Sequence, residues 1–512
     1  MLEIGQDRLT VENLIMAAKK QTETILCNHP AFMAKIECGA DFLERTLVQN
    51  GRIYGVTTGF GDSCTETVER EHYRDLQINL TRFHGCALGA YFDEETTRAI
   101  MIVRLNTLCQ GFSGVSYGLL QKIDFFIQND ILPLIPQEGS VGASGDLTPL
   151  SYLAGALIGE REVLYKGTAQ SSAVVLKKLN EEKYSFRPKE AIAIMNGTAV
   201  MNAVAALALA RASYLADLAC EITALNALAL KSNAYHFYGK LFDVKPFPGQ
   251  KKAAKKILAS LASGEKTENV MPEKIQDNYS IRCAPHVIGV FYDTEDLLRT
   301  LIETEMNSAN DNPIIDPSTN SVYHGGHFYG GHICFAMDSL KNVVANIADL
   351  LDRQLALLVD AKYNRGLPLN LSGAGKSIPH NHGFKAVQIA SSAWTAEALK
   401  NAMPASVFSR STECHNQDKV SMGTIAARDC IRIIELTEQV ASAALLAAVQ
   451  AVNLRLRNKE LHSVNIQKNA AGIYEGVLSF FLPLEEDRML EGDLKKTLAA
   501  IRNNFFKMGG NS

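Results

Sequence analysis

The sequence predicts a mainly α protein with a long central helix bundle, and three observations support that fold class. Apolar residues recur at spacings of three and four across residues 333–360, which is the period of one buried helix face. Residues 199–231 and 440–454 are apolar on nearly every face, so each expected helix needs neighbours on most sides. Strand signals are few and short. We therefore expect long packed helices, in a bundle that extends across subunits.

The shorter elements, taken in order along the chain, predict a smaller mixed region near the N-terminus. Residues 52–58 alternate weakly between apolar and polar, and residues 163–165 and 321–327 are typical of small hairpins or loops. The segment 245–275 is rich in lysine and glycine and is expected to be an exposed excursion. Glycine and proline cluster where we expect loops between helices, at 55–61, 133–149, 283–290, 312–331 and 364–383.

A domain boundary is expected near residues 190–200. It divides the mixed N-terminal region, residues 1–195, from the bundle and C-terminal helices of residues 196–512. The stretch 191–210 has no charged residue and has the length of a membrane span. Because it is mostly alanine and contains polar residues such as Asn196, we interpret it as a buried helix instead.

Composition limits the classes of partner. A net charge of −4 offers no basic surface for nucleic acid, and no membrane anchor is expected. The ten cysteines are scattered without a CxxC pair or a zinc-like spacing, so we expect no metal and predict reduced thiols in the cytoplasm. Residues 1–8 are charged and lack the apolar core of a signal peptide.

The most informative short motif is Ala143-Ser144-Gly145. If the amide nitrogen of Gly145 attacks the carbonyl carbon of Ala143, a five-membered ring closes in the backbone. Loss of water from the ring, and of the Ser144 hydroxyl, then leaves an exocyclic methylene. Alanine and glycine leave the closing atoms uncrowded, and glycine permits the strained backbone that closure needs. An ordinary turn is the alternative for so small and polar a triplet.

Residues 139–159 as a whole resemble the signature of the histidine and aromatic amino acid ammonia-lyases, and the similarity spans about residues 9–455. In that family the triplet becomes 4-methylidene-imidazole-5-one (MIO), so the resemblance implies a group formed by the chain itself, with no metal and no diffusible cofactor. It further implies the ammonia-lyase (fumarase/aspartase-like) architecture, with several helix N-termini directed at the MIO group. It also implies a homotetramer whose active sites are shared between subunits.

Tyr54 is the candidate base. It begins the sequence Tyr-Gly-Val-Thr-Thr-Gly-Phe-Gly, which is similar to the tyrosine-and-glycine loop of the family, and Gly61 at its end is expected to border the substrate. Because a phenol ionises at about pH 10 in water, we expect positive surroundings to lower the pKa of Tyr54. A tyrosine that only anchors a glycine-rich turn is the alternative.

Arg282 is the candidate clamp for the substrate carboxylate. It lies in Gln-Asp-Asn-Tyr-Ser-Ile-Arg-Cys-Ala-Pro, residues 276–285, which closely matches a Gln…Tyr…Arg motif of the family. A guanidinium can donate two parallel hydrogen bonds to a carboxylate. The resemblance implies that Gln276 and Tyr279 frame the substrate and the MIO group. Taken singly, Arg282 fits a surface ion pair better, and its neighbours in the motif favour the clamp.

Three further segments match the family. Asn196, in the sequence Met-Asn-Gly-Thr, is expected to hydrogen-bond the imidazolone oxygen or the substrate carboxylate. Phe328 is expected at the substrate, although it follows His327, where relatives usually have asparagine. The polar loop 307–313 is interpreted as a structural cap at a helix end.

Two positions track the substrate in the family. The pair after the Leu-Gln motif is Phe83-His84, a hybrid of the Phe-Leu, His-Leu and Ser-His pairs of phenylalanine-, tyrosine- and histidine-type relatives. Gln417 stands where histidine-specific relatives have glutamate. A neutral imidazole can bind a phenolic hydroxyl, which leucine cannot. These positions rank tyrosine first, phenylalanine second and histidine third, while contact with an imidazole substrate or a purely structural role stays open for His84.

The sequence thus predicts a carbon–nitrogen lyase, most similar to the tyrosine ammonia-lyases, that converts L-tyrosine to 4-coumarate and ammonia. An aminomutase, which returns the amine to the β-carbon, would use the same residues and differ in lid closure and retention time. A non-catalytic helical scaffold is disfavoured because Tyr54, Ser144 and Arg282 are all present. A fumarase-like lyase is disfavoured because that family's serine-rich loop signature is missing.

Overall fold

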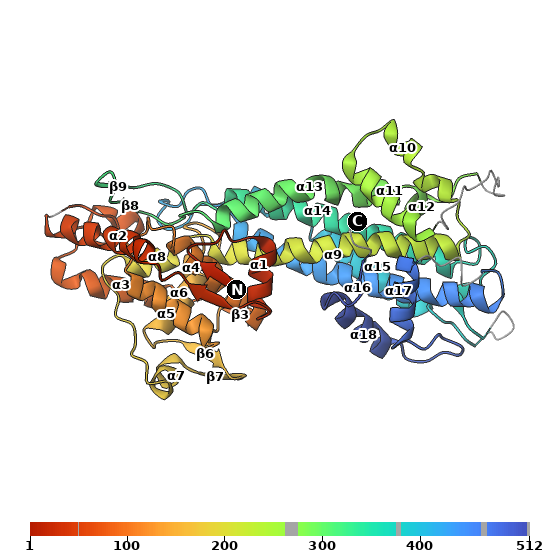
Figure 1. The fold of residues 1–512 in the computed structure, drawn as a ribbon, viewed down its shortest axis with the longest axis horizontal. Coiled ribbons are helices and arrows are strands. Elements are labelled where there is room, and N and C mark those ends of the chain that lie inside the picture. Colours follow the sequence, from red (N-terminus) through yellow and green to blue (C-terminus); the bar gives the residue numbers. More distant parts are fainter. Residues whose placement is uncertain (50, 262–274, 375–379, 462–467, 509–512) are drawn as a thin grey trace. The chain divides into compact units, whose positions relative to one another are not determined.

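The structure is a computed structural model, and it describes residues 1–49, 51–261, 275–374, 380–461 and 468–508 (Figure 1). It is mainly α, which confirms the predicted fold class. The chain divides into two compact units, each assembled from three segments. The first unit comprises Met1–Ala208, Arg299–Asp338 and Pro404–Arg428, and the second comprises Leu209–Leu298, Ser339–Met403 and Asp429–Ser512.

The first unit contains most of the shorter helices and the described strands. Its helices are α1 (Val11–Ala18), α2 (Pro30–Val48), α3 (Tyr73–Phe83), α4 (Glu94–Leu108), α5 (Tyr117–Gln128), α6 (Leu147–Leu157), α7 (Ser172–Lys178), α8 (Glu190–Met195) and the 3₁₀ turns η1 (Gly61–Thr65), η2 (Arg70–His72) and η5 (Ala405–Phe408). Its strands are β1 (Leu2–Ile4), β2 (Thr24–Leu26), β3 (Leu88–Tyr91), β4 (Leu132–Pro133), β5 (Pro136–Glu138), β6 (Glu162–Tyr165), β7 (Thr168–Ser171), β8 (Ile314–Asp316) and β9 (Ser321–Tyr323).

The strands form small sheets. β1 pairs parallel with β2, β3 pairs antiparallel with β5, and β8 pairs antiparallel with β9. β4, β6 and β7 form an antiparallel sheet with β6 at its centre. The weakly alternating residues 52–58 form a turn and not a strand. The reason is local, because the amides of Ile53 and Gly55 donate to the hydroxyl oxygens of Thr57 and Thr58 (2.8 and 3.2 Å).

The chain passes between the units at five points, of which four lie inside long helices and one lies between residues 403 and 404. These helices are α9 (Ala199–Ala229), α13 (Ala284–Met306), α14 (Gly331–Val359) and α16 (Gly423–Arg457). The expected boundary between residues 195 and 196 therefore differs from the division of the structure, because α9 runs on through residue 208 and the first unit also includes later segments. The helix expected over 333–360 is α14, and residues 440–454 lie within α16.

The second unit is a helix bundle to which shorter helices are added (Figure 1). Asp352 of α14 is fully buried and accepts hydrogen bonds from Ser391 and Ser392 of α15 (2.9 and 3.1 Å). Arg211 of α9 donates twice to Glu438 of α16 (2.9 Å each), so this pair of charged groups between two long helices is satisfied. The shorter elements are η3 (Ala234–Phe237), α10 (Gly239–Asp243), α11 (Pro248–Leu261), α12 (Tyr279–Arg282), η4 (Leu369–Leu371), α15 (Lys385–Lys400), α17 (Lys468–Leu478) and α18 (Glu491–Arg502).

Two apolar segments differ from their sequence-based interpretation. The stretch 191–210 is buried as expected, but it forms two helices, α8 and α9, that are interrupted at residues 196–198. The segment 245–275 begins with α11, whose Ala253 and Ile257 pack inward while its lysines face water, and residues 262–274 lie outside the described residues.

Two of the described helices, α9 and α16, have the length and hydropathy of a membrane span. Their most apolar windows are 72% and 83% buried inside the structure, respectively. Core helices of globular proteins meet the same criteria, so these helices are weak evidence for a membrane.

Candidate active site

The triplet of residues 143–145 lies in the loop between β5 and α6, and two side chains from distant segments hold its central serine. The side-chain amide of Asn196 donates to the Ser144 carbonyl oxygen (3.0 Å). The side-chain amide of Gln417 donates to the Ser144 hydroxyl oxygen (3.3 Å). The structure therefore brings together three of the site residues that the sequence predicts.

The turn from the triplet into α6 is compact. Gly145 has φ +67° and lies against the Gly197 carbonyl, where the Cβ of any other residue would overlap. Asp146, which is fully buried, accepts hydrogen bonds from the amides of Val200 and Met201 in α9 (2.9 Å each). It also accepts one from the Thr424 hydroxyl in α16 (2.6 Å). The first turns of α6, α9 and α16 thus meet beside the triplet.

This arrangement has two electrostatic consequences. Burial raises the pKa of Asp146 to about 6, although the Thr424 hydroxyl and two helix amides stabilise the carboxylate. Helix N-termini carry positive potential, so three of them near the triplet favour negative charge that develops there.

Asn196 reaches the triplet because the helical path is interrupted between α8 and α9. Arg104 of α4, which is 1% exposed, donates to the carbonyls of Ala193 and Asn196, the latter at 2.8 Å. Its other terminal nitrogen donates to Asn310 Oδ1 (2.9 Å). Burial lowers the pKa of Arg104 to about 10, so the guanidinium stays charged at neutral pH. Within the described structure the Asn196 Oδ1 atom is buried without a partner, which leaves an acceptor for a bound molecule.

These surroundings fit an imidazolone ring closed within the triplet. The carbonyl of Ser144, which would become the ring carbonyl, already receives a side-chain amide hydrogen bond. The residues that would close the ring are alanine and glycine, and Gly145 occupies a place that no side chain could share. Amide donors and helix N-termini would stabilise negative charge on such a ring.

Tyr54 lies in the turn of residues 52–58, and its hydroxyl oxygen accepts the amide proton of Gly61 (2.8 Å). Burial raises the pKa of Tyr54 above its usual value, the Gly61 hydrogen bond partly opposes that rise, and the charge of Glu413 adds to it. The expected lowering of this pKa is therefore wrong for the chain as described. The physical reasons are burial, which disfavours the phenolate most, and the negative charge of Glu413, which adds to that effect.

Glu413 is a site residue that the sequence interpretation missed. Both of its carboxylate oxygens accept the Asp62 amide proton (3.0 and 3.2 Å), and the carboxylate lies against Gly61, where a Cβ would overlap it. Residues 413–415 have φ values of +49°, +52° and +64°, a left-handed backbone that costs non-glycine residues about 1–2 kcal/mol each. Because no glycine occurs there, the only sequence signal was proximity to Gln417.

Aromatic rings form one wall beside Tyr54. The ring centroids of Tyr54 and Phe60 are 6.3 Å apart, those of Phe60 and Phe83 are 6.5 Å apart, and those of Phe83 and His84 are 4.4 Å apart. Phe83 is 57% exposed, so the wall has an open face. Burial lowers the pKa of His84, which keeps its imidazole neutral at neutral pH. Its Nδ1 lies 3.1 Å from the Leu80 carbonyl and donates to it, which leaves Nε2 as an acceptor.

The segment that carries Gln417 also fixes the direction of its amide. The Thr412 hydroxyl donates to Gln417 Oε1 (2.8 Å), so Nε2 is directed at Ser144. Phe328 lies in the turn before α14, and the neighbouring Tyr329 hydroxyl donates to the Val420 carbonyl (3.5 Å). The Phe328 turn is therefore tied to the Gln417 segment.

Gln276, Tyr279 and Arg282 belong to the second unit and form a group with contacts of its own. Arg282 Nε donates to the Asp277 carbonyl (3.1 Å), and its guanidinium lies 4.4 Å from the centroid of the Tyr279 ring. Gln276 and Tyr279 are exposed. Among the described residues the two terminal nitrogens of Arg282 have no hydrogen-bond partner, so both can face a carboxylate.

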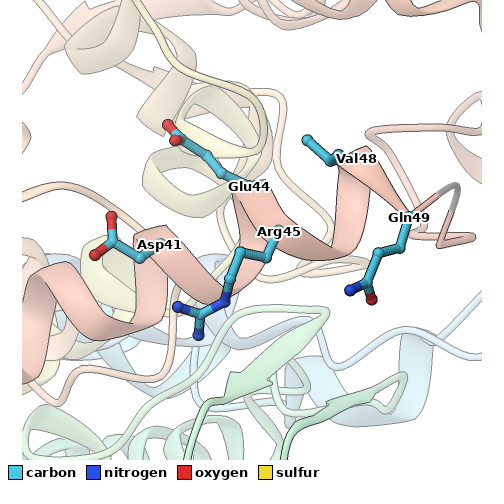
Figure 2. A pocket seen from close by; sticks show the side chains of 5 residues that line it. All are labelled: Asp41, Glu44, Arg45, Val48 and Gln49. Atoms are coloured by element: carbon cyan, nitrogen blue, oxygen red, sulfur yellow. The ribbon is translucent and has the colours of Figure 1, made fainter.

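A surface hollow of about 380 Å³ lies along α2. Figure 2 shows its five side chains directed to different sides of that helix. They are Asp41, Glu44, Arg45, Val48 and Gln49. None of them is a candidate site residue, and we assign the hollow no role. Across the described part of the chain, no group of three or more His, Cys, Asp and Glu side chains is suited to a metal ion.

Comparison with known proteins relates this geometry to a family. The sequence model described as aromatic amino acid lyase matches residues 9–475. A histidine ammonia-lyase of Macrococcus caseolyticus is 34% identical over 508 residues, which cover 98% of this chain and 99% of the relative. The crystal structure of a tyrosine aminomutase from Streptomyces globisporus has a TM-score of 0.91 at 30% identity, covering 99% of this chain and 97% of the other. A phenylalanine aminomutase of Pantoea agglomerans has a TM-score of 0.91 at 28% identity, covering 98% and 99%.

Proposed function

This chain belongs to the aromatic amino acid lyase family and is a carbon–nitrogen lyase, and we propose that it removes ammonia from L-tyrosine to give 4-coumarate. The observation that carries the proposal is the hydrogen bonding of Ser144, whose carbonyl and hydroxyl oxygens are each held by a side-chain amide. Such donors suit a triplet that is to become an electrophile, and an ordinary turn has no need of them.

In this proposal residues 143–145 form the MIO group. The group supplies an electrophilic carbon for the substrate amine, which is otherwise a poor leaving group. Asn196 holds the imidazolone oxygen through Nδ2, and its unpaired Oδ1 is an acceptor for the substrate ammonium. Gln417 donates toward the position of the Ser144 side chain.

Tyr54 takes the proton from the substrate β-carbon onto its phenolic oxygen. This role needs the phenolate, whose formation burial and Glu413 oppose in the single chain. We therefore propose that the homotetramer supplies positive charge at Tyr54, with active sites shared between subunits. The Gly61 amide remains as a donor to the phenolate, and Glu413 is placed to attract the substrate ammonium.

Arg282 binds the substrate carboxylate with its two free terminal nitrogens, and the ring of Tyr279 stacks on the same guanidinium. Gln276, which precedes the Asp277 carbonyl that orients Arg282, is exposed and available to the substrate. Holding the carboxylate aligns the β-carbon with the base, which is a positioning effect.

Two residues favour tyrosine. The hydrogen bond of His84 Nδ1 leaves Nε2 as an acceptor for a phenolic hydroxyl, and the lowered pKa keeps that nitrogen unprotonated near neutral pH. Phenylalanine has no donor for it and would leave a half-buried acceptor unpaired. Gln417 is neutral and already paired with Thr412 and Ser144, so it offers no charge to an imidazole.

Histidine is the second candidate substrate, because the similar relative from Macrococcus is named a histidine ammonia-lyase and an imidazole N–H can also donate to His84 Nε2. Aminomutase activity is the second candidate reaction, because the similar structure from Streptomyces is named a tyrosine aminomutase. Its product would be the β-amino acid.

The test offers tyrosine, phenylalanine and histidine separately to the purified protein. Ultraviolet absorbance follows the unsaturated acid, and mass spectrometry with chiral separation detects any β-amino acid. We expect 4-coumarate and ammonia from tyrosine as the fastest reaction. Faster release of the unsaturated acid from histidine, or a β-amino acid as the main product, would contradict the respective part of the proposal.

The His84→Leu variant tests the assignment of substrate. Loss of the acceptor is expected to shift the tyrosine-to-phenylalanine ratio of kcat/KM toward phenylalanine by roughly 10- to 10²-fold, the cost of an unmatched polar group. The kcat/KM values for tyrosine and phenylalanine are measured on the same preparation, so the fraction of folded protein cancels from their ratio. An unchanged ratio would mean that His84 does not contact the ring substituent.

A further inference from the structure

Gln77 is a polar side chain at the centre of the first unit that the mechanism above does not use. It lies in the middle of α3 and is fully buried, with 0% of its surface exposed. A buried amide needs partners for both its donor and its acceptor, because either one left unpaired costs about 1–3 kcal/mol.

Both ends of the Gln77 amide are paired, and each partner belongs to a different catalytic segment. Nε2 donates to the carbonyl of Gly55 (2.8 Å), the residue that follows Tyr54. Oε1 accepts the amide proton of Ile192 (3.2 Å), in the helix α8 whose end presents Asn196. One side chain therefore bridges the turn that carries the base and the helix that leads to the triplet.

The two bridged segments are also held by apolar packing, because Ile53 and Val56 lie in a buried cluster with α2 and β8. Gly55 in addition lies against the Ile192 side chain, but apolar contacts fix direction less closely than hydrogen bonds do. The turn of residues 52–58 is held mostly by its own threonine hydroxyls, so its internal bonds set its shape and leave its position to outside contacts. The Tyr54 amide donates to His324 Nε2 (3.3 Å), but this contact is exposed. Among the hydrogen bonds of the described residues, the buried Gln77 bridge is the one that joins this turn to α8.

We propose that Gln77 is a positioning residue that fixes the spacing between Tyr54 and Asn196, and so between the base and the electrophile. The inference rests on the proposed function, because it gives Tyr54 the proton transfer. A displacement of about 1 Å between reacting groups can cost about 10²-fold in rate, so a bridge of two hydrogen bonds is sufficient to matter.

Three variants of the full-length protein test this role. Gln77→Leu removes both hydrogen bonds with little change in volume. Gln77→Glu keeps the acceptor, and its protonated form also keeps a donor. Thr81→Val is the matched control, since Thr81 is buried one turn later in α3. Among the described residues its hydroxyl bonds only to the Ile78 carbonyl of its own helix (2.8 Å).

The readouts separate positioning from folding. Mass spectrometry reports whether each variant has lost two water molecules at the triplet. Steady-state rates with ordinary and β-deuterated tyrosine give kcat, KM and the isotope effect on proton removal. We expect Gln77→Leu to keep the mass deficit, to lose roughly 10²-fold in kcat with KM little changed, and to show a larger isotope effect because proton transfer has become slower. Thr81→Val should match the wild type.

The Gln77→Glu variant adds a signature that a merely structural residue lacks. Only the protonated carboxyl can donate to Gly55 while accepting from Ile192, so the kcat of this variant relative to Gln77→Leu should rise as the pH falls. A lower kcat for Gln77→Leu with an unchanged isotope effect overturns the role, because fewer folded molecules give that result. A wild-type protein that deaminates none of the three amino acids overturns the proposed function itself.

Discussion

The surroundings of the triplet and those of the carboxylate clamp are built differently. Around the triplet, Asn196 and Asp146 are 3% and 0% exposed, and their partners Ser144 and Thr424 lie 52 and 278 positions away in sequence. At the clamp, Tyr279 is 72% exposed, and Arg282 bonds a carbonyl only five positions away. The triplet is held by contacts across the first unit, whereas the proposed clamp consists of the short helix α12 and the residues just before it.

The difference separates two tasks. A buried neighbourhood whose donors are already held in place is suited to chemistry on the backbone, which needs a fixed geometry before any substrate arrives. A half-buried arginine with free terminal nitrogens is suited to meeting a ligand, and it needs a second surface to exclude water from the carboxylate. The proposed sharing of active sites between subunits would provide that surface.

The largest expected effect comes from Ser144→Ala, which removes the leaving oxygen. The mass of this variant should equal the value expected from its sequence, without the deficit of two water molecules. Its activity should fall by roughly 10³-fold or more, as when a central catalytic group is removed. Intact-protein mass spectrometry and the absorbance assay measure both. Ser151→Ala is the matched control, because Ser151 is a buried serine of α6 whose hydroxyl bonds only to Thr148 of the same helix. Equal deamination by Ser144→Ala and the wild type would show that the ring is not the catalyst.

Arg282→Ala tests whether the clamp is independent of the triplet. Two charge-assisted hydrogen bonds to the substrate carboxylate would be lost, so kcat/KM should fall by about 10²-fold while the mass deficit stays complete. Arg282→Lys keeps the charge without the fork and should recover only part of the activity. If Arg282→Ala lacked the mass deficit, ring closure at the triplet would depend on Arg282. That result would contradict the independence of the two regions.

The smallest expected effect concerns the pH profile of the base. The negative charge of Glu413 contributes to the raised pKa of Tyr54, so Glu413→Gln should lower that pKa and move the rising limb of kcat/KM to lower pH. The plateau of kcat/KM should fall by about tenfold, because the neutral glutamine side chain no longer attracts the substrate ammonium. Glu475→Gln, at an exposed glutamate of α17, is the control and should leave the limb in place. If the rising limb of kcat/KM for Glu413→Gln did not move, or moved to higher pH, Tyr54 would not be the titrating base.

Local sequence patterns were enough to predict much of the fold and some of the candidate site residues. The spacing of apolar residues predicts α14, because a helix face has the same period in sequence and in space. The apolar composition of residues 440–454 on nearly every face predicts only that part of α16. The turn of residues 52–58 was misread because threonine hydroxyls bond the backbone there, and an alternating pattern does not reveal that competition. Glu413 was missed because its left-handed backbone carries no glycine signal.

The sequence by itself determined that the chain is a helical protein of this family. It also supplied the candidate triplet, the candidate base Tyr54 and the candidate clamp Arg282, because these proposals depend on residue type and short spacing. Only the tertiary structure decided that the amide of Asn196 faces the Ser144 carbonyl and that the nitrogen of Gln417 faces its hydroxyl. It also decided that Tyr54 has a carboxylate and not a cation as its charged neighbour. These contacts join residues tens to hundreds of positions apart, so hydrogen-bond direction and the balance of burial against charge arise only when the chain is folded.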